Sequence, residues 1–123
     1  MKDALIIMLI VALVIIGNII SQDMLKKDSE KLVEKLEKIR NELGNGNIEQ
    51  LAEELYELWE QTEKKWSIII LHQELDNIKL AVIAVKSSIE SGDLTYAYQQ
   101  VNNAIFLVEH QTEKWSLKWK NIF

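Results

Sequence analysis

The chain has 123 residues, with no proline, no cysteine, four glycines and a formal net charge of −5. This length favours one domain, and the scarcity of proline and glycine favours long helices over tight β turns. The absence of cysteine excludes disulfides, thiolate metal sites and cysteine nucleophiles. The acidic balance lies after the N-terminal apolar run and argues against nucleic acid as a partner.

The N-terminal segment is an apolar run, ALIIMLIVALVIIGNII at residues 4–20, interrupted only by Asn18. As a helix it would be about 25 Å long, which is the short end of a membrane span. Apolar residues cover every face, which favours a span over a buried core helix. No small-x-small cleavage site follows, so an uncleaved anchor is favoured over a signal peptide. We predict a single-pass cell-membrane protein, with an anchor at residues 1–23 that meets the bilayer through residues 4–20.

The rest of the chain, residues 24–123, reads as a helical bundle domain. Apolar residues recur at steps of three and four in three series, at residues 25–43, 48–89 and 94–122. The sequences GNGN at 44–47 and SGD at 91–93 predict the turns between them. No glycine or proline interrupts the second series, which predicts one long helix over residues 48–90.

The predicted fold is therefore all-α, with an N-terminal transmembrane helix followed by an antiparallel, coiled-coil-like bundle of three helices around a long central one. A four-helix bundle, with a break near residues 66–73, is the alternative. If the span ran straight into the first bundle helix, the second half of the long helix would lie in lipid. Its charged side chains make that arrangement unfavourable in free energy. We expect a bend between Gly17 and Asp28 to resolve this conflict. If the helices pair as antiparallel neighbours across the two predicted turns, Trp66 lies where the three helices meet. It is then opposite Leu25, and Trp115 faces Ile68.

Two histidines each have a carboxylate on the same helical face. His72 stands four residues before Asp76, with Glu74 round the side, and His110 stands three before Glu113. This spacing can hold a metal ion. In a chain rich in glutamate it also arises by chance, so a solvated position or a hydrogen bond across the bundle is the favoured role of His72.

No catalytic, cofactor-binding or metal residue is assigned from the sequence. The serines lie in no nucleophile-elbow motif, and no glycine-rich loop is present to cradle a phosphate. We therefore expect that the protein is not an enzyme and needs no cofactor.

Four tryptophans, at positions 59, 66, 115 and 119, are many for this length. Core packing is the favoured interpretation, because all except Trp59 fall on the apolar series. The alternative is an aromatic platform or an interfacial anchor, since KWSLKWK at 114–120 mixes tryptophan with lysine.

Several stretches carry a family resemblance. They are the apolar N-terminal segment, LYELWEQTEKKW at 55–66, HQELDNI at 72–78 and SLKWKNIF at 116–123. With these features the chain resembles the bacterial family called domain of unknown function 4363, of clostridia and their relatives. The chain departs from that pattern at Trp119 and in having few basic residues before the span. The resemblance implies a membrane-anchored helical protein whose bundle faces outward, and it brings no substrate or catalytic residue.

The expected function is that of a membrane-anchored interaction or accessory protein whose partner is another membrane or envelope protein. The alternative is a ligand- or metal-binding sensor domain centred on His72 and Asp76.

Overall fold

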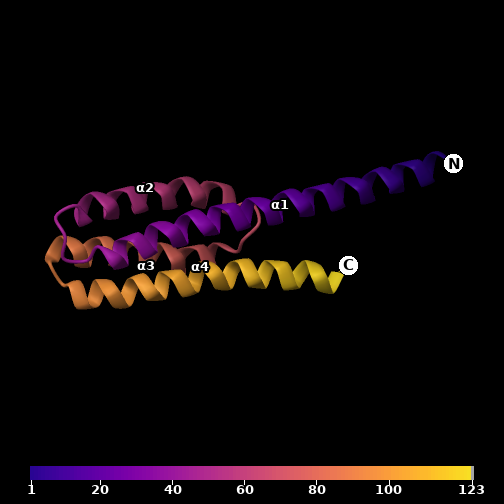
Figure 1. The fold of residues 1–123 in the computed structure, drawn as a ribbon. Helices are drawn as coiled ribbons and strands as arrows, with labels where there is room; N and C mark the ends of the chain where they lie inside the picture. Colours follow the sequence, from indigo (N-terminus) through magenta and orange to yellow (C-terminus); the bar gives the residue numbers. More distant parts are fainter. Residues whose placement is uncertain (123) are drawn as a thin grey trace.

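Four helices account for almost the whole chain. The computed structural model describes the backbone of residues 1–122 and the side chains of residues 1–115. Its helices are α1 (Lys2–Asn41), α2 (Ile48–Trp66), α3 (His72–Ser91) and α4 (Leu94–Ile122). Both α1 and α3 pack against α2 and α4, which gives an antiparallel bundle (Figure 1). The prediction of an all-α bundle is confirmed, and the four-helix form is the one observed.

The first helix serves two parts of the molecule. Its N-terminal half projects from the bundle, and its C-terminal half supplies buried apolar side chains to the core (Figure 1). The helix runs unbroken through residue 23, where the predicted anchor meets the predicted bundle domain. Even the polar residues after the apolar run stay helical, and the Gln22 amide donates to Asn18 Oδ1 at 3.0 Å across one turn. The bend predicted between Gly17 and Asp28 is therefore wrong.

The predicted long central helix is also wrong, because the chain reverses between Trp66 and His72. The N–H groups of Ile69 and Ile70 both return to the Trp66 carbonyl, at 3.0 and 2.8 Å, and Leu71 is extended with ψ 137°. Three consecutive β-branched isoleucines lower the local helix propensity only slightly, and the reversal buries Ile70 while α3 folds back on α2.

This reversal removes the conflict that the bend was meant to resolve. Instead of continuing in line with the apolar run, α3 folds back within the bundle, where it packs against α2 and α4 (Figure 1). The helix that carries the apolar run can then continue straight into the bundle.

The two glycine-containing turns lie where the sequence predicts them. At the end of α3, Gly92 adopts a left-handed conformation with φ 80°, and the Asp93 N–H donates to the Ser88 carbonyl at 2.9 Å. Asp93 Oδ1 then accepts a hydrogen bond from the Tyr96 N–H at 3.1 Å, which caps the start of α4. The α1–α2 turn contains Gly44 with φ 94°.

One apolar cluster joins all four helices. Its fully buried members include leucines of α1, the tryptophans of α2, and smaller β-branched residues and alanines of α3 and α4. The largest of these buried side chains are Leu25, Leu32, Leu36, Ile39, Leu55, Trp59, Trp66, Leu75 and Ile78.

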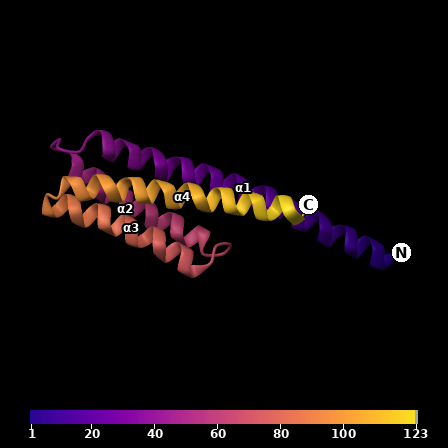
Figure 2. The same cartoon turned by 90° about the horizontal axis from the view of Figure 1, so that it is seen from below.

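The α2–α3 loop and the end of α4 lie at the end of the bundle from which α1 emerges. Figures 1 and 2 both show α4 continuing past this loop, alongside the projecting half of α1. Ser29 pairs with Thr112 and Arg40 with Asn102, so the numbers of facing residues in α1 and α4 add to 141 or 142. On this register the last helical residue, Ile122, lies level with residues 19–20, where the apolar run ends.

Candidate functional site

The projecting half of α1 is an apolar surface that the described part of the bundle leaves exposed. The apolar stretch of this helix is long enough to cross a membrane, and none of it is buried within the structure. Leucines and isoleucines on all sides are exposed, Leu9 and Leu13 by 62% and 60%. Among the described residues α1 is the one helix whose length and composition suit a membrane span. A core helix of a soluble protein is largely buried, so this helix differs from that class.

A buried carboxylate ties the C-terminal half of α1 to the end of α2. The Asp28 side chain is only 7% exposed. Its Oδ1 accepts from the Lys65 ammonium at 2.9 Å, and its Oδ2 accepts from the Trp66 indole N–H at 3.2 Å. The sequence analysis did not single out this residue. The available signal was its place between Leu25 and Leu32, on the face that the apolar series defines.

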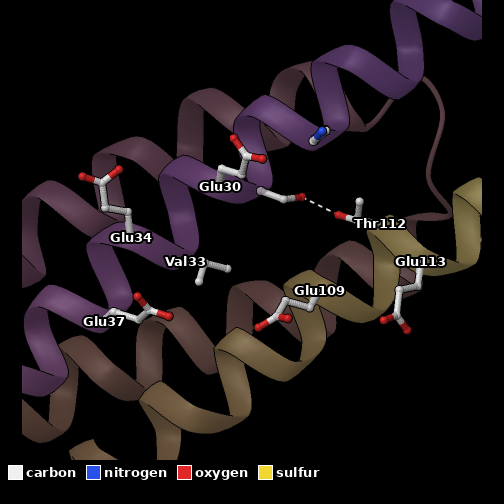
Figure 3. A pocket seen from close by; sticks show the side chains of 9 residues that line it. Glu30, Val33, Glu34, Glu37, Glu109, Thr112 and Glu113 are labelled. Carbon is white, nitrogen blue, oxygen red and sulfur yellow. Dashed lines mark hydrogen bonds between the residues drawn. The ribbon is translucent and has the colours of Figure 1, made fainter.

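The pairing of α1 with α4 joins the two ends of the chain. Ser29 Oγ and Thr112 Oγ1 share a hydrogen bond at 2.5 Å, and Arg40 donates to Asn102 Oδ1 at 2.8 Å. Between these two contacts lies a surface groove of about 450 Å³ (Figure 3). Its lining is mostly acidic, with Val33 between the helices and glutamates on both sides at positions 30, 34, 37, 109 and 113.

The histidine positions do not form a metal site in the described part of the chain. His72 Nε2 lies 3.7 Å from Asp76 Oδ2, and the His72 side chain is 88% exposed. Glu74 pairs instead with Lys114 of α4. No group of three histidines, cysteines or carboxylates among the described residues could hold a metal ion. Nothing in this geometry supports the sensor alternative centred on His72 and Asp76.

His110 has both an aromatic and a carboxylate neighbourhood on α4. Its ring stacks on that of Phe106, with centroids 5.8 Å apart and planes 13° from parallel. Both side chains lie on the exposed face of α4. Glu113, the carboxylate predicted to share its face, lines a surface pocket with Phe106 and His110 and also the groove between α1 and α4.

Two of the four tryptophans are core residues. Trp59 and Trp66 are fully buried, and their rings meet edge to face with centroids 6.0 Å apart. Trp115 is partly buried against the same core. The core interpretation is confirmed for Trp59 and Trp66. The Trp119 side chain lies outside the described residues.

The predicted surroundings of Trp66 need correction. Trp66 does contact the start of the part of α1 that belongs to the bundle, because its indole donates a hydrogen bond to Asp28. Ile68, however, is 84% exposed and does not face Trp115 as expected. Trp115 lines a small cavity with Ile69, Ile70 and Leu71 instead.

Two surface ion-pair positions stabilise the charged form of their groups. Lys35 of α1 donates to Glu54 of α2 at 2.7 Å, and this hydrogen bond lowers the pKa of the Glu54 carboxyl below its ordinary value of 4.5. The hydrogen bond with Glu90 raises the pKa of Lys86 above 10.5, and Glu53 adds to this shift from 3.6 Å.

The fold and surface described above define a class: a small helical bundle whose first helix extends outward as an exposed apolar rod. A family model described as "Domain of unknown function (DUF4363)" matches residues 19–122. The chain belongs to this family, which confirms the resemblance drawn from the sequence. No curated protein and no solved structure matches the chain. The family match begins at the end of the apolar run and covers the whole bundle.

Proposed function

We propose that this protein is a membrane-anchored interaction protein without catalytic activity. Residues 4–20 of α1 cross the bilayer, and the bundle presents its surface to another membrane or envelope protein. One observation carries the anchor: the apolar half of α1 is exposed on every side, while the same helix continues unbroken into a well-packed core. Transfer of this exposed apolar helix segment from water into the hydrocarbon layer of a bilayer is favourable in free energy.

The interaction role rests on the rest of the described surface. The bundle has a buried hydrogen bond between Asp28 and Trp66, and the exposed faces of its α1 and α2 segments carry mainly carboxylates and lysines. A membrane-anchored scaffold of this kind acts by holding a partner near the bilayer.

Extraction of membranes with alkaline carbonate tests the anchor. The full chain is expected in the pellet. Arginine at two positions within the run, Leu9→Arg with Leu13→Arg, costs about 2.5–3.5 kcal/mol for each residue in a span and should shift the chain to the supernatant. The matched control is Leu80→Arg with Phe106→Arg, because these residues are just as exposed, 64% and 65%, but belong to the bundle.

The control pair should stay in the pellet. Release of the parent chain, with a mature N-terminus near Ser21, would make the segment a signal peptide and overturn the anchor.

The proposal places the bundle on the outer face of the cell membrane, as the family resemblance implies. The lysines that follow the run, at positions 26, 27, 31 and 35, would favour the inner face by the positive-inside rule. Protease added to intact cells decides between the two faces. Loss of the bundle is the expected result, and full protection until the cells are lysed would overturn this orientation.

Capture of the full-length protein in mild detergent tests the interaction role. A membrane or envelope protein that co-purifies in stoichiometric amount is the expected result. A chain that remains alone, at its own mass, after cross-linking in intact membranes would contradict it.

A further inference from the structure

The α2–α3 loop, residues 67–71, exposes two large apolar side chains at one end of the bundle. Ile68 is 84% exposed and Leu71 is 71% exposed, while Ile70 between them is buried in the core. Ile70 and the hydrogen bonds from Ile69 and Ile70 to the Trp66 carbonyl hold the loop in place. The exposed side chains of Ile68 and Leu71 therefore belong to a loop whose conformation is held by its contacts with the bundle.

This loop lies close to the level at which the apolar run of α1 ends. The contacts of Asp28 with Lys65 and Trp66 place the end of α2 level with residue 28. Eight helical residues separate residue 28 from Ile20, a rise of about 12 Å. The loop continues beyond Trp66 toward that end, which shortens the remaining gap (Figures 1 and 2).

Trp115 gives an independent measure of the same level. It lines one cavity with Ile19, Gln22 and Leu25 of α1, and a second cavity with Ile69 and Leu71 of the loop. One tryptophan therefore borders both the end of the apolar run and the loop.

On these observations, and resting on the proposed span, we infer that the α2–α3 loop is a second membrane contact. Ile68 and Leu71 enter the boundary between headgroups and acyl chains of the bilayer that α1 crosses. The headgroup layer on each side of a bilayer is about 5–8 Å deep. The loop lies within about 12 Å of the end of the apolar run, measured along α1, so its apolar side chains are close to this layer.

The chemistry around the loop suits this layer. Lys64 and Lys65 end α2 just before it, and Lys114 lies beside it on α4, paired with Glu74. The last turns of α4, whose backbone reaches the level of residues 19–20, carry Lys118 and Lys120 in their sequence. Lysine with tryptophan and aliphatic tips is the composition typical of membrane interfaces, where ammonium groups meet lipid phosphates. The loop would fix the rotation of the bundle about the span.

Environment-sensitive labels test this inference, because the chain has no native cysteine. Single variants Ile68→Cys and Leu71→Cys of the full chain carry a nitrobenzoxadiazole label in vesicles of phosphatidylcholine and phosphatidylglycerol. The matched controls are Leu80→Cys and Phe106→Cys, exposed positions on α3 and α4 that lie further from this end of the bundle. Leu13→Cys reports the span.

Labels at 68 and 71 should show blue-shifted emission that is lost when nitroxides sit near the headgroups, while labels at 80 and 106 stay water-like and unquenched. Water-like emission at both 68 and 71, with Leu13→Cys quenched by deep nitroxides, would overturn the loop contact and leave the span standing. An unquenched label at position 13 would instead overturn the span, and the loop contact with it.

Discussion

The Asp28 carboxylate accepts a hydrogen bond from the Trp66 indole at 3.2 Å, although the two residues are 38 positions apart in the chain. The contact joins the first bundle turns of α1 to the last turn of α2, close to the end from which the apolar rod emerges. It fixes how α1 is rotated against α2, because a buried carboxylate must keep its hydrogen-bond donors.

Removing that carboxylate should destabilise the bundle. Asp28→Ala leaves the buried Trp66 N–H without its acceptor, which typically costs about 1–3 kcal/mol. Asp28→Asn keeps an acceptor for the indole and should cost less. Urea unfolding of detergent-solubilised protein measures both changes. The control is Asp23→Ala, which removes an exposed pair with Lys27 worth about 0–1 kcal/mol. An equal loss of unfolding free energy in Asp28→Ala and Asp23→Ala would contradict the role of the buried Asp28 hydrogen bonds.

Both core tryptophans should matter for stability. Trp59→Ala and Trp66→Ala each remove a fully buried ring, at a typical cost of about 3–5 kcal/mol. The sequence placed Trp59 outside the apolar series, but its burial and its edge-to-face contact with Trp66 make it a core residue. Thermal melting followed by helical circular dichroism compares them, with the exposed Phe106→Ala as control. If Trp59→Ala melts at the same temperature as the parent, the burial of the Trp59 ring in the core is contradicted.

A left-handed glycine ends α3. Gly92→Ala should cost about 1–2 kcal/mol, because a Cβ disfavours φ 80°. Gly46→Ala is a matched control, since Gly46 has no positive φ and open space around its Cα. The control should be neutral or slightly stabilising by lowering the entropy of the unfolded chain. The melting temperatures of Gly92→Ala and Gly46→Ala test this prediction. Equal values would contradict the left-handed conformation of Gly92.

Acid should weaken the α1–α2 pairing through Glu54. Because the folded-state pKa of Glu54 lies below its ordinary value of 4.5, the pair with Lys35 stabilises the fold above that pH, and the stabilisation is lost as pH falls through the folded pKa. Glu54→Gln should flatten this part of the pH dependence of the melting temperature. Glu57→Gln is the control, since the structure shows no ion pair for Glu57 among the described residues. A profile unchanged by Glu54→Gln would contradict the pairing.

The sequence predicted those parts of the fold that local chemistry determines. The apolar run, the turns at GNGN and SGD, and the three-and-four spacing of Leu25, Leu32 and Leu36 all correspond to observed structure. Each depends on residues close together in the chain.

The break after Trp66 was harder to predict, because no glycine or proline marks it. Its signal is a slip in the apolar repeat: Leu75 falls out of step with the series that ends at Trp66. The burial gained when α3 folds back on α2 outweighs the local helical preference, and that gain depends on packing between segments distant in the chain.

Side-chain partners across the bundle were not predictable either. Helical periodicity places Asp28 and Thr112 on inward faces, but it does not say which donor or acceptor each one meets. The pairing of α1 with α4 brings together the two ends of the chain, and short-range turn signals carry no information about it.

The central claim is that α1 crosses a membrane with residues 4–20 and continues without interruption as the first helix of the bundle. A cysteine scan of positions 4–40, in the membrane-bound full chain, tests it with a membrane-impermeant maleimide applied from either side. We predict no labelling on any face over residues 4–20. Beyond residue 21 labelling should repeat every three to four residues, with Leu25, Leu32 and Leu36 protected. Helical periodicity in the labelling of residues 4–20, or uniform labelling across residues 17–28, would contradict the claim.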